Sequence, residues 1–323
     1  MTYAGHDAAQ AGIGKSELLE LVDASVASTL SAIKSTYLMC APDYFEVSYV
    51  INPWMAGNIA HADHHVARMQ WEELVNEIAS VAIVQRIPAK AGVPDLVFTA
   101  NGGVVRGHKV VLSRFRHVER QAEEIHFEHW FAAHGFEVLK LAPHLPFEGA
   151  GDALLDRHDD LLWFGHGHRS DVACAEPLSQ LLEVEVQPLR LVDARFYHLD
   201  TCFCPLEGGE VMYFPDAFDA ASQMAIAARV PAYRRLIVSA DDALHFACNS
   251  VNCGRHIFLN YASVALVDVL TAHGYTVHQT PLTEFLKAGG AAKCLTLKLN
   301  EPIPRKETIP SVISLVDVVD CQE

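Results

Sequence analysis

The sequence lacks two features that mark large classes of proteins: long apolar runs and an excess of positive charge. No apolar stretch reaches the length of about 18 residues that a membrane-spanning helix needs. Acidic residues outnumber basic ones by 40 to 24, which gives a formal net charge of −16. Because binding to a nucleic-acid backbone depends on a positive surface, we do not expect a nucleic acid as a partner. Because no apolar run is long enough to span a bilayer, we do not expect a membrane either. A protein this acidic does attract small cationic molecules.

Paired cysteine motifs and an N-terminal export signal are also missing. The eight cysteines are scattered, without the C-x-x-C spacing of metal or redox sites. Residues 1–10 lack the basic and then apolar pattern of a signal peptide. We therefore expect free thiols and a cytoplasmic location. His61 and His65 have a spacing that suits zinc on a helix, but no third ligand is evident, so no metal site is predicted.

A repeated pattern of short strands and helices fills most of the chain. Each unit reads strand, strand, helix, strand, with a period of roughly 45–55 residues, which is typical of radial or stacked repeats. Four units begin with strands expected near residues 96–100, 153–155, 202–206 and 249–253. A fifth unit is split: a strand at 294–299 is completed by a strand at 45–51 and a helix at 60–82 from the start of the chain.

A unit shared between the two ends of a chain is how a ring of repeats is closed. The pattern therefore predicts an α/β fold, a five-bladed pseudo-symmetric propeller of ββαβ units, as a single domain over residues 37–323. Residues 1–36 are expected to form an N-terminal helical extension, with an amphipathic helix at 15–35. An ordinary α+β domain with coincidental spacing is the alternative.

One cysteine has a setting unlike the other seven. The glycine pair Gly289-Gly290 allows a sharp turn, and Cys294 follows at the start of the last predicted strand. Polar residues recur near the first strand of other units: Asn101 follows the first strand of one unit, and Glu148 and His198 lie in segments that lead into the first strands of the next two. In a closed ring the first strands line the central channel, so these side chains should meet at one site.

The residue types at these positions suit nucleophilic chemistry. A cysteine thiol has an ordinary pKa of about 8.5, so a nearby positive charge increases its reactive thiolate fraction. His198 can transfer a proton to a leaving amine, and Glu148 can hold a planar cation. Each also has a structural interpretation: Glu148 as a turn cap, His198 as a core histidine, Cys294 as an inert thiol. Their recurrence in the module favours a shared catalytic site.

Four motifs together resemble the guanidino-group-modifying enzymes of the pentein superfamily. They are FEGAGD around Glu148, HLDT from His198, GGAAKC ending at Cys294, and MCAPDYFEVSYVINPWMAGN near the N-terminus. That superfamily has a five-bladed α/β propeller fold, and it includes arginine deiminases, arginine dihydrolases, dimethylarginine dimethylaminohydrolases and amidinotransferases. The resemblance covers roughly residues 37–300 and implies catalysis without a metal or an organic cofactor.

The resemblance also implies a role for individual residues. Cys294 would be the nucleophile that attacks the guanidinium carbon, His198 the general acid and base, and Glu148 a ligand of the guanidinium nitrogens. Arg169 matches the arginine that clamps the substrate α-carboxylate, for which a bidentate guanidinium is well suited. Further substrate-binding residues by resemblance are Arg120, Asp152 and Asp95, and Asn52 is expected to reach the site because the strand that it follows closes the ring.

Asn101 departs from the pattern of the deiminases and dimethylargininases, which commonly place an aspartate there. An amide at this place is similar to the arginine dihydrolase branch, which releases ornithine, ammonia and carbon dioxide from arginine. A dimethylarginine dimethylaminohydrolase that gives citrulline and dimethylamine is the first alternative, and an amidinotransferase is the second. A propeller that binds a ligand without catalysis is the third. A homo-oligomer is compatible with the sequence.

Overall fold

The computed structural model describes residues 34–301. The helical extension predicted for residues 1–36 lies almost wholly outside the described residues. Within them, no helix is long and apolar enough to cross a membrane.

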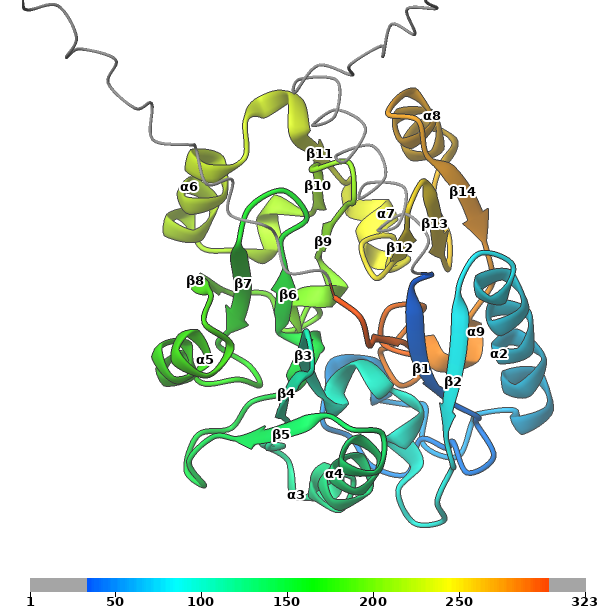
Figure 1. Cartoon of the computed structure of the whole chain (residues 1–323). Helices are drawn as coiled ribbons and strands as arrows, with labels where there is room; N and C mark the ends of the chain where they lie inside the picture. Colours follow the sequence, from blue (N-terminus) through cyan, green and yellow to red (C-terminus); the bar gives the residue numbers. More distant parts are fainter. Residues whose placement is uncertain (1–33, 302–323) are drawn as a thin grey trace, which may run out of the picture.

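Five three-stranded sheets surround a common centre, and one long helix lies on the outer side of each (Figure 1). This arrangement confirms the predicted five-bladed α/β propeller. The strands are β1 (Thr36–Cys40), β2 (Ile83–Ile87), β3 (Gly103–Arg106), β4 (Lys109–Leu112), β5 (Glu137–Lys140), β6 (Ala153–Leu155), β7 (Leu161–His166), β8 (Glu185–Arg190), β9 (Phe203–Pro205), β10 (Val211–Tyr213), β11 (Arg235–Ile237), β12 (Val251–Cys253), β13 (His256–Leu259), β14 (Thr276–Gln279) and β15 (Leu297–Lys298).

All five sheets share one topology. The inner strand runs antiparallel to the middle strand, which is parallel to the outer strand, as in β6-β7-β8. A helix connects the middle strand to the outer one, as a parallel pair requires. The connecting helices are α2 (His64–Ala79), α4 (Glu124–Ala133), α5 (Ala175–Leu182), α6 (Ala220–Arg229) and α8 (Val264–Ala272). Shorter helices are α3 (Val118–Gln121), α7 (Ala240–Leu244) and α9 (Thr283–Leu286).

Helix α2 illustrates how the sequence sets these elements. It begins after Asp63, whose carboxylate accepts hydrogen bonds from the backbone N–H groups of His65 and Val66 and so caps the helix. Its buried residues recur every three or four positions, which gives one apolar face toward the sheets. They are Ala67, Trp71, Leu74, Val75 and Ile78.

The split fifth unit closes the ring. Strand β15, from the end of the described chain, pairs antiparallel with β1, with Leu38 opposite Leu297. The side-chain oxygen of Asn300 accepts a hydrogen bond of 2.8 Å from the backbone N–H of Thr36. Closure by the two ends of the chain is therefore confirmed.

The prediction that a strand at residues 45–51 completes this unit is wrong. That segment is irregular, and β1 at Thr36–Cys40 takes the place in the sheet. Proline flanks the segment at Pro42 and Pro53, and the ring of Phe45 packs on Phe285 with centroids 4.9 Å apart. Phe45 and Val47 are buried, whereas Val50 is 51% exposed, and Phe45 packs on helix α9 rather than joining a ladder.

Two other predicted strands also begin later than expected. Residues 96–100 fall in two 3-10 helices, Pro94–Val97 and Thr99–Gly102, because Pro94 suits the first turn of a helix and lacks a ladder donor. Cys294 lies on a turn three residues before β15, since the side chain of Asn249 accepts its backbone N–H at 3.1 Å. The inner strands are consequently short, and turns occupy the places next to them.

Replacing Leu38 by Ala should lower the free energy of unfolding by about 2–5 kcal/mol, because this fully buried side chain lies on the closing strand. Ile83→Ala in β2 of the same sheet is the control. Since Ile83 is 48% exposed, its loss should be below about 1 kcal/mol. Urea unfolding measures both, and equal losses would contradict the placement of β1 in the core.

Candidate active site

The turns that precede the inner strands meet at one end of the ring axis. The 3-10 helices Gly149–Gly151 and Leu199–Thr201 precede β6 and β9. Hydrogen bonds join these turns: Asn101 Nδ2 donates to the carbonyl of Glu148 at 3.3 Å, and the amide nitrogen of Ala100 donates to the carbonyl of Cys294 at 3.2 Å. The structure therefore brings together the polar positions that the repeat placed at equivalent points.

Glycine at two positions allows this close approach. A Cβ on Gly151 would lie 2.3 Å from Nδ2 of Asn101 and 3.3 Å from the ring of His198. Gly149 has a φ of +59° in the left-handed region, which most side chains avoid. The GAG sequence is thus required by the packing of the turns.

The thiol of Cys294 is buried and held between an amide and a carboxylate. Nδ2 of Asn249 donates to its Sγ at 3.1 Å, and Sγ lies 3.6 Å from Oδ2 of Asp200. Burial raises the pKa of the Cys294 thiol, and the Asp200 carboxylate raises it further. Burial also raises the pKa of Asp200 to about 7. The resting thiol is therefore protonated at neutral pH.

Glu148 joins His198 and Arg169 in a buried triad. Oε2 of Glu148 lies 2.7 Å from Nε2 of His198 and accepts from Nη1 of Arg169 at 2.8 Å. Burial opposes the charge of Glu148, but Arg169 and His198 outweigh it and hold the pKa of this carboxyl well below its usual range. Burial lowers the pKa of His198 to about 4, against the opposing effect of Glu148. The pair thus consists of a carboxylate and a neutral imidazole.

Arg120 is already paired in the structure. It donates to both carboxylate oxygens of Glu123, at 2.7 and 2.8 Å, and to Oδ1 of Asn101 at 2.9 Å. This contact orients the Asn101 amide. Glu123 was not among the predicted site residues, although its position three residues after Arg120 across helix α3 is the spacing at which helical side chains meet.

Asp95 presents an unused oxygen to the same cavity. Its Oδ2 accepts from the hydroxyl of Tyr49 at 2.8 Å and lies 3.7 Å from Nε of Arg120. Its Oδ1 is buried without a hydrogen-bond partner. A buried acceptor of this kind calls for a donor, and the cavity offers the place for one.

Asn52 and Asp152 have different settings. Asn52 lines the cavity and caps the 3-10 helix Pro53–Met55, and its Nδ2 donates to the carbonyl of Ala288 at 3.0 Å. Asp152 lies behind the site, where it accepts from the Ser170 hydroxyl at 2.7 Å and from the backbone N–H of Leu199 at 3.1 Å. It fixes the turn next to His198 and does not line the cavity.

The cavity itself is small, and both charged and apolar side chains line it. Tyr197, which was not predicted, contributes its ring: Arg169 stacks on it at 4.6 Å, and its hydroxyl donates to the carbonyl of Gly289 at 2.7 Å. Asp200 and Asn249 were also missing from the predicted set, although both belong to motifs at the recurring point of the module. The lining residues are Ile51, Asn52, Met55, Asp95, Phe98, Asn101, Arg120, Arg169, Tyr197, Ala288 and Cys294.

The part of the chain that the structure describes contains no set of ligands for a metal ion. No group of three or more His, Cys, Asp or Glu side chains there is arranged to hold a metal ion. The arrangement instead offers a thiol, a neutral imidazole on a carboxylate, and a set of paired arginines around a closed cavity.

Two curated relatives have names that refer to guanidino chemistry. The chain is 52% identical over 281 residues to the bifunctional arginine dihydrolase/ornithine cyclodeaminase ArgZ of Synechocystis sp., a match that covers 87% of this chain and 39% of the relative. It is 36% identical over 265 residues to the N(G),N(G)-dimethylarginine dimethylaminohydrolase of Mycobacterium tuberculosis, covering 82% and 85%. The chain thus spans about two fifths of the length of the bifunctional relative.

The solved structure of the N-terminal domain of ArgZ superposes with a TM-score of 0.83 at 52% identity, covering 84% of this chain and all of that domain. That structure is of a cysteine-to-serine variant bound to substrate. Residues 52–300 match the family N,N dimethylarginine dimethylhydrolase, eukaryotic. The chain therefore belongs to this family, and the resemblance to the guanidino-group-modifying enzymes of the pentein fold is confirmed.

Proposed function

We propose that this chain hydrolyses arginine to ornithine, ammonia and carbon dioxide. The observation that carries the proposal is the cavity that both Cys294 and Asn101 line, with the Glu148–His198 pair joined to it by the hydrogen bond from Asn101 to the Glu148 carbonyl. The 52% identity to an arginine dihydrolase over 87% of the chain supports it.

The charges of the cavity suit a cationic amino acid. The carboxylate of Asp200, which lies next to the thiol, and that of Glu148 would hold the guanidinium, and the orphaned Oδ1 of Asp95 would accept from the α-amino group. Arg169 and Arg120 line the same cavity and would face the α-carboxylate. A small cationic substrate is therefore the proposed partner.

The first half of the reaction breaks one carbon–nitrogen bond. The His198 imidazole takes the proton of the Cys294 thiol as the sulfur adds to the guanidinium carbon. It then delivers that proton to the departing nitrogen, which leaves as ammonia. Water then attacks the thiouronium carbon, with the imidazole accepting its proton. The thiolate leaves, and the side chain of the substrate is now a neutral ureido group.

The second half repeats these steps on the ureido carbon. Attack by the thiolate and loss of the second ammonia give a thiocarbamate, and water releases a carbamate that decomposes to the amine and carbon dioxide. Two waters are consumed in total. Here a neutral group must bind where a cation did, and the Asn101 amide can both donate and accept hydrogen bonds to it, as a carboxylate cannot.

The substrate itself activates the nucleophile. Because burial and Asp200 raise the pKa of Cys294, the resting thiol is protonated, and an entering guanidinium supplies the positive charge that stabilises the thiolate. Asp200 therefore has two opposed effects: it attracts the substrate, and it suppresses the thiolate while the site is empty.

Replacing Cys294 by Ser should lower the release of ornithine and ammonia from arginine by at least about a thousandfold, because the nucleophile is lost. Quantifying amino acids and ammonia after separate incubations with arginine, dimethylarginine and citrulline checks this. Cys253→Ser, at a thiol outside the cavity, is the control and should retain activity. Turnover of dimethylarginine alone would make the chain a dimethylargininase, and dependence on an added amine acceptor would make it an amidinotransferase.

Asn101→Asp should shift the product from ornithine toward citrulline by at least about tenfold, because a carboxylate pairs with guanidinium but not with the neutral ureido group. Asn52→Asp makes the same chemical change elsewhere in the cavity, where we expect weaker binding of arginine with an unchanged product ratio. An unchanged ornithine-to-citrulline ratio in Asn101→Asp would overturn the assignment of this amide.

Asp200→Asn should shift the midpoint of the pH dependence of Cys294 alkylation by iodoacetamide to lower pH. The Asp200 carboxylate raises the pKa of the thiol, so removing its charge lowers that pKa and exposes more thiolate at neutral pH. Peptide mass spectrometry over a pH series gives the midpoint, with Asp95→Asn as a control that should leave it in place. The KM for arginine should rise in the same Asp200→Asn variant, and a midpoint that moves to higher pH would contradict the argument.

A further inference from the structure

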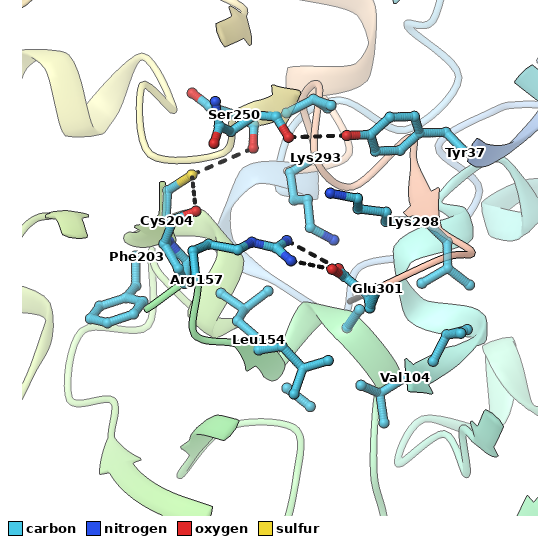
Figure 2. A pocket seen from close by; sticks show the side chains of 18 of the residues that line it. Tyr37, Val104, Leu154, Arg157, Phe203, Cys204, Ser250, Lys293, Lys298 and Glu301 are labelled. Atoms are coloured by element: carbon cyan, nitrogen blue, oxygen red, sulfur yellow. Dashed lines mark hydrogen bonds and ion pairs between the residues drawn. The ribbon is translucent and has the colours of Figure 1, made fainter. Parts of the chain in front are cut away.

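A second and larger cavity lies between the inner strands of the ring (Figure 2). The inner strands of all five sheets contribute to its wall: β3, β6, β9, β12 and β15. Apolar side chains form much of that wall, among them Val104, Leu154, Leu155 and Leu297. The proposed reaction uses none of these residues.

Three cations face this apolar space: Arg157, Lys293 and Lys298. Two of them have partners. The Arg157 guanidinium is bidentate to Glu301, with one contact at 3.0 Å, and Nζ of Lys298 lies 2.8 Å from Oε1 of Glu207. Within each pair, the carboxylate neutralises the charge of its cation.

Lys293 is the cation that remains. Among residues 34–301 its ammonium has no carboxylate within salt-bridge distance and no hydrogen-bond acceptor, whereas other lysines of the cavity and surface do. Figure 2 shows the side chain directed into the space beside the Arg157–Glu301 pair, with the end of Lys298 nearby. The described wall of the cavity therefore carries one uncompensated positive charge.

We propose that the central cavity is a binding site for one small monocarboxylate, whose anionic end pairs with Lys293 and whose hydrocarbon end packs on the inner strands. One unmatched cation calls for one negative charge, since a partly buried ammonium gains most from a charge-assisted hydrogen bond. The apolar wall favours a short alkyl chain over a purely polar anion. A guanidinium or other cation is excluded by the same charge.

The proposed anion site and the nucleophile are joined by a single peptide bond, the one between Lys293 and Cys294. Asn249 binds both residues of that peptide: its carbonyl accepts from the N–H of Lys293 at 3.2 Å, and its Oδ1 accepts from the N–H of Cys294 at 3.1 Å. The Lys293 ammonium lowers the pKa of both Asp200 and Cys294. A carboxylate on Lys293 would weaken that effect, so bound anion should slow turnover; this consequence alone rests on the proposed function.

Binding is tested on the full chain with butyrate as the probe and butyramide as its uncharged counterpart. Isothermal titration should give saturable binding of butyrate and none of butyramide. Methyl NMR on the same protein locates the ligand without any substitution: the methyl groups of Leu154, Leu155 and Leu297 should shift saturably with butyrate. The absence of saturable shifts, or equal shifts with butyramide, would overturn the proposal.

Lys293→Met should weaken butyrate binding by at least about tenfold, and Lys293→Arg, which retains the charge, should keep it. Arg169→Lys separates this cavity from the candidate active site and should leave butyrate binding unchanged. Butyrate affinity that survives in Lys293→Met, or falls in Arg169→Lys, would place the anion elsewhere. Because these readouts do not involve arginine, they can fail or succeed independently of the proposed reaction.

Discussion

The pairing of β1 with β15 is the interaction on which the candidate site depends. Every inner strand is only two to four residues long, so no single sheet could hold a turn in place. Closure makes each sheet the neighbour of two others and brings five turns to one end of an axis. Asn101, Glu148, His198, Asn249 and Cys294 lie in the segments before the inner strands of five different sheets, and they meet only because the ring is closed.

The site then has to support buried charges. Burying an ion is costly unless it is paired and hydrogen-bonded, and here each arginine of the cavity has a carboxylate: Glu123 for Arg120 and Glu148 for Arg169. Such pairs fix side chains in one geometry before the ligand arrives, which reduces the ordering required on binding. Among the described residues, Asp200 has no salt-bridge partner and Oδ1 of Asp95 has no hydrogen-bond donor. These two positions are therefore where a bound cation would gain most.

The sequence was sufficient to predict the ring and much of the site because both follow from periodicity. The repeat located the polar positions, and the geometry of a closed ring required them to meet. Local conformation was less predictable. The apolar segment at 45–51 satisfies a strand pattern, yet it packs on helix α9, because tertiary burial and not the pattern decides which apolar run joins a sheet.

Partners of the site residues were harder to predict for a similar reason. Glu123 and Asp200 act through contacts with Arg120 and Cys294, and a sequence shows the residues but not the contacts. Asp200 lies two residues after His198, where a strand would direct the two side chains to the same face. The 3-10 helix Leu199–Thr201 turns the backbone instead, so that His198 reaches Glu148 while Asp200 reaches the thiol.

The position of Lys293 next to Cys294 follows from the same geometry. Lys293 lines the central cavity, whereas Cys294, the next residue of the same turn, lines the candidate site. An alanine at position 293 would leave only the paired ions in the channel wall, whereas lysine adds a positive charge that lowers the pKa of both Asp200 and the thiol. The channel is in this way electrostatically part of the site, although no substrate atom needs to enter it.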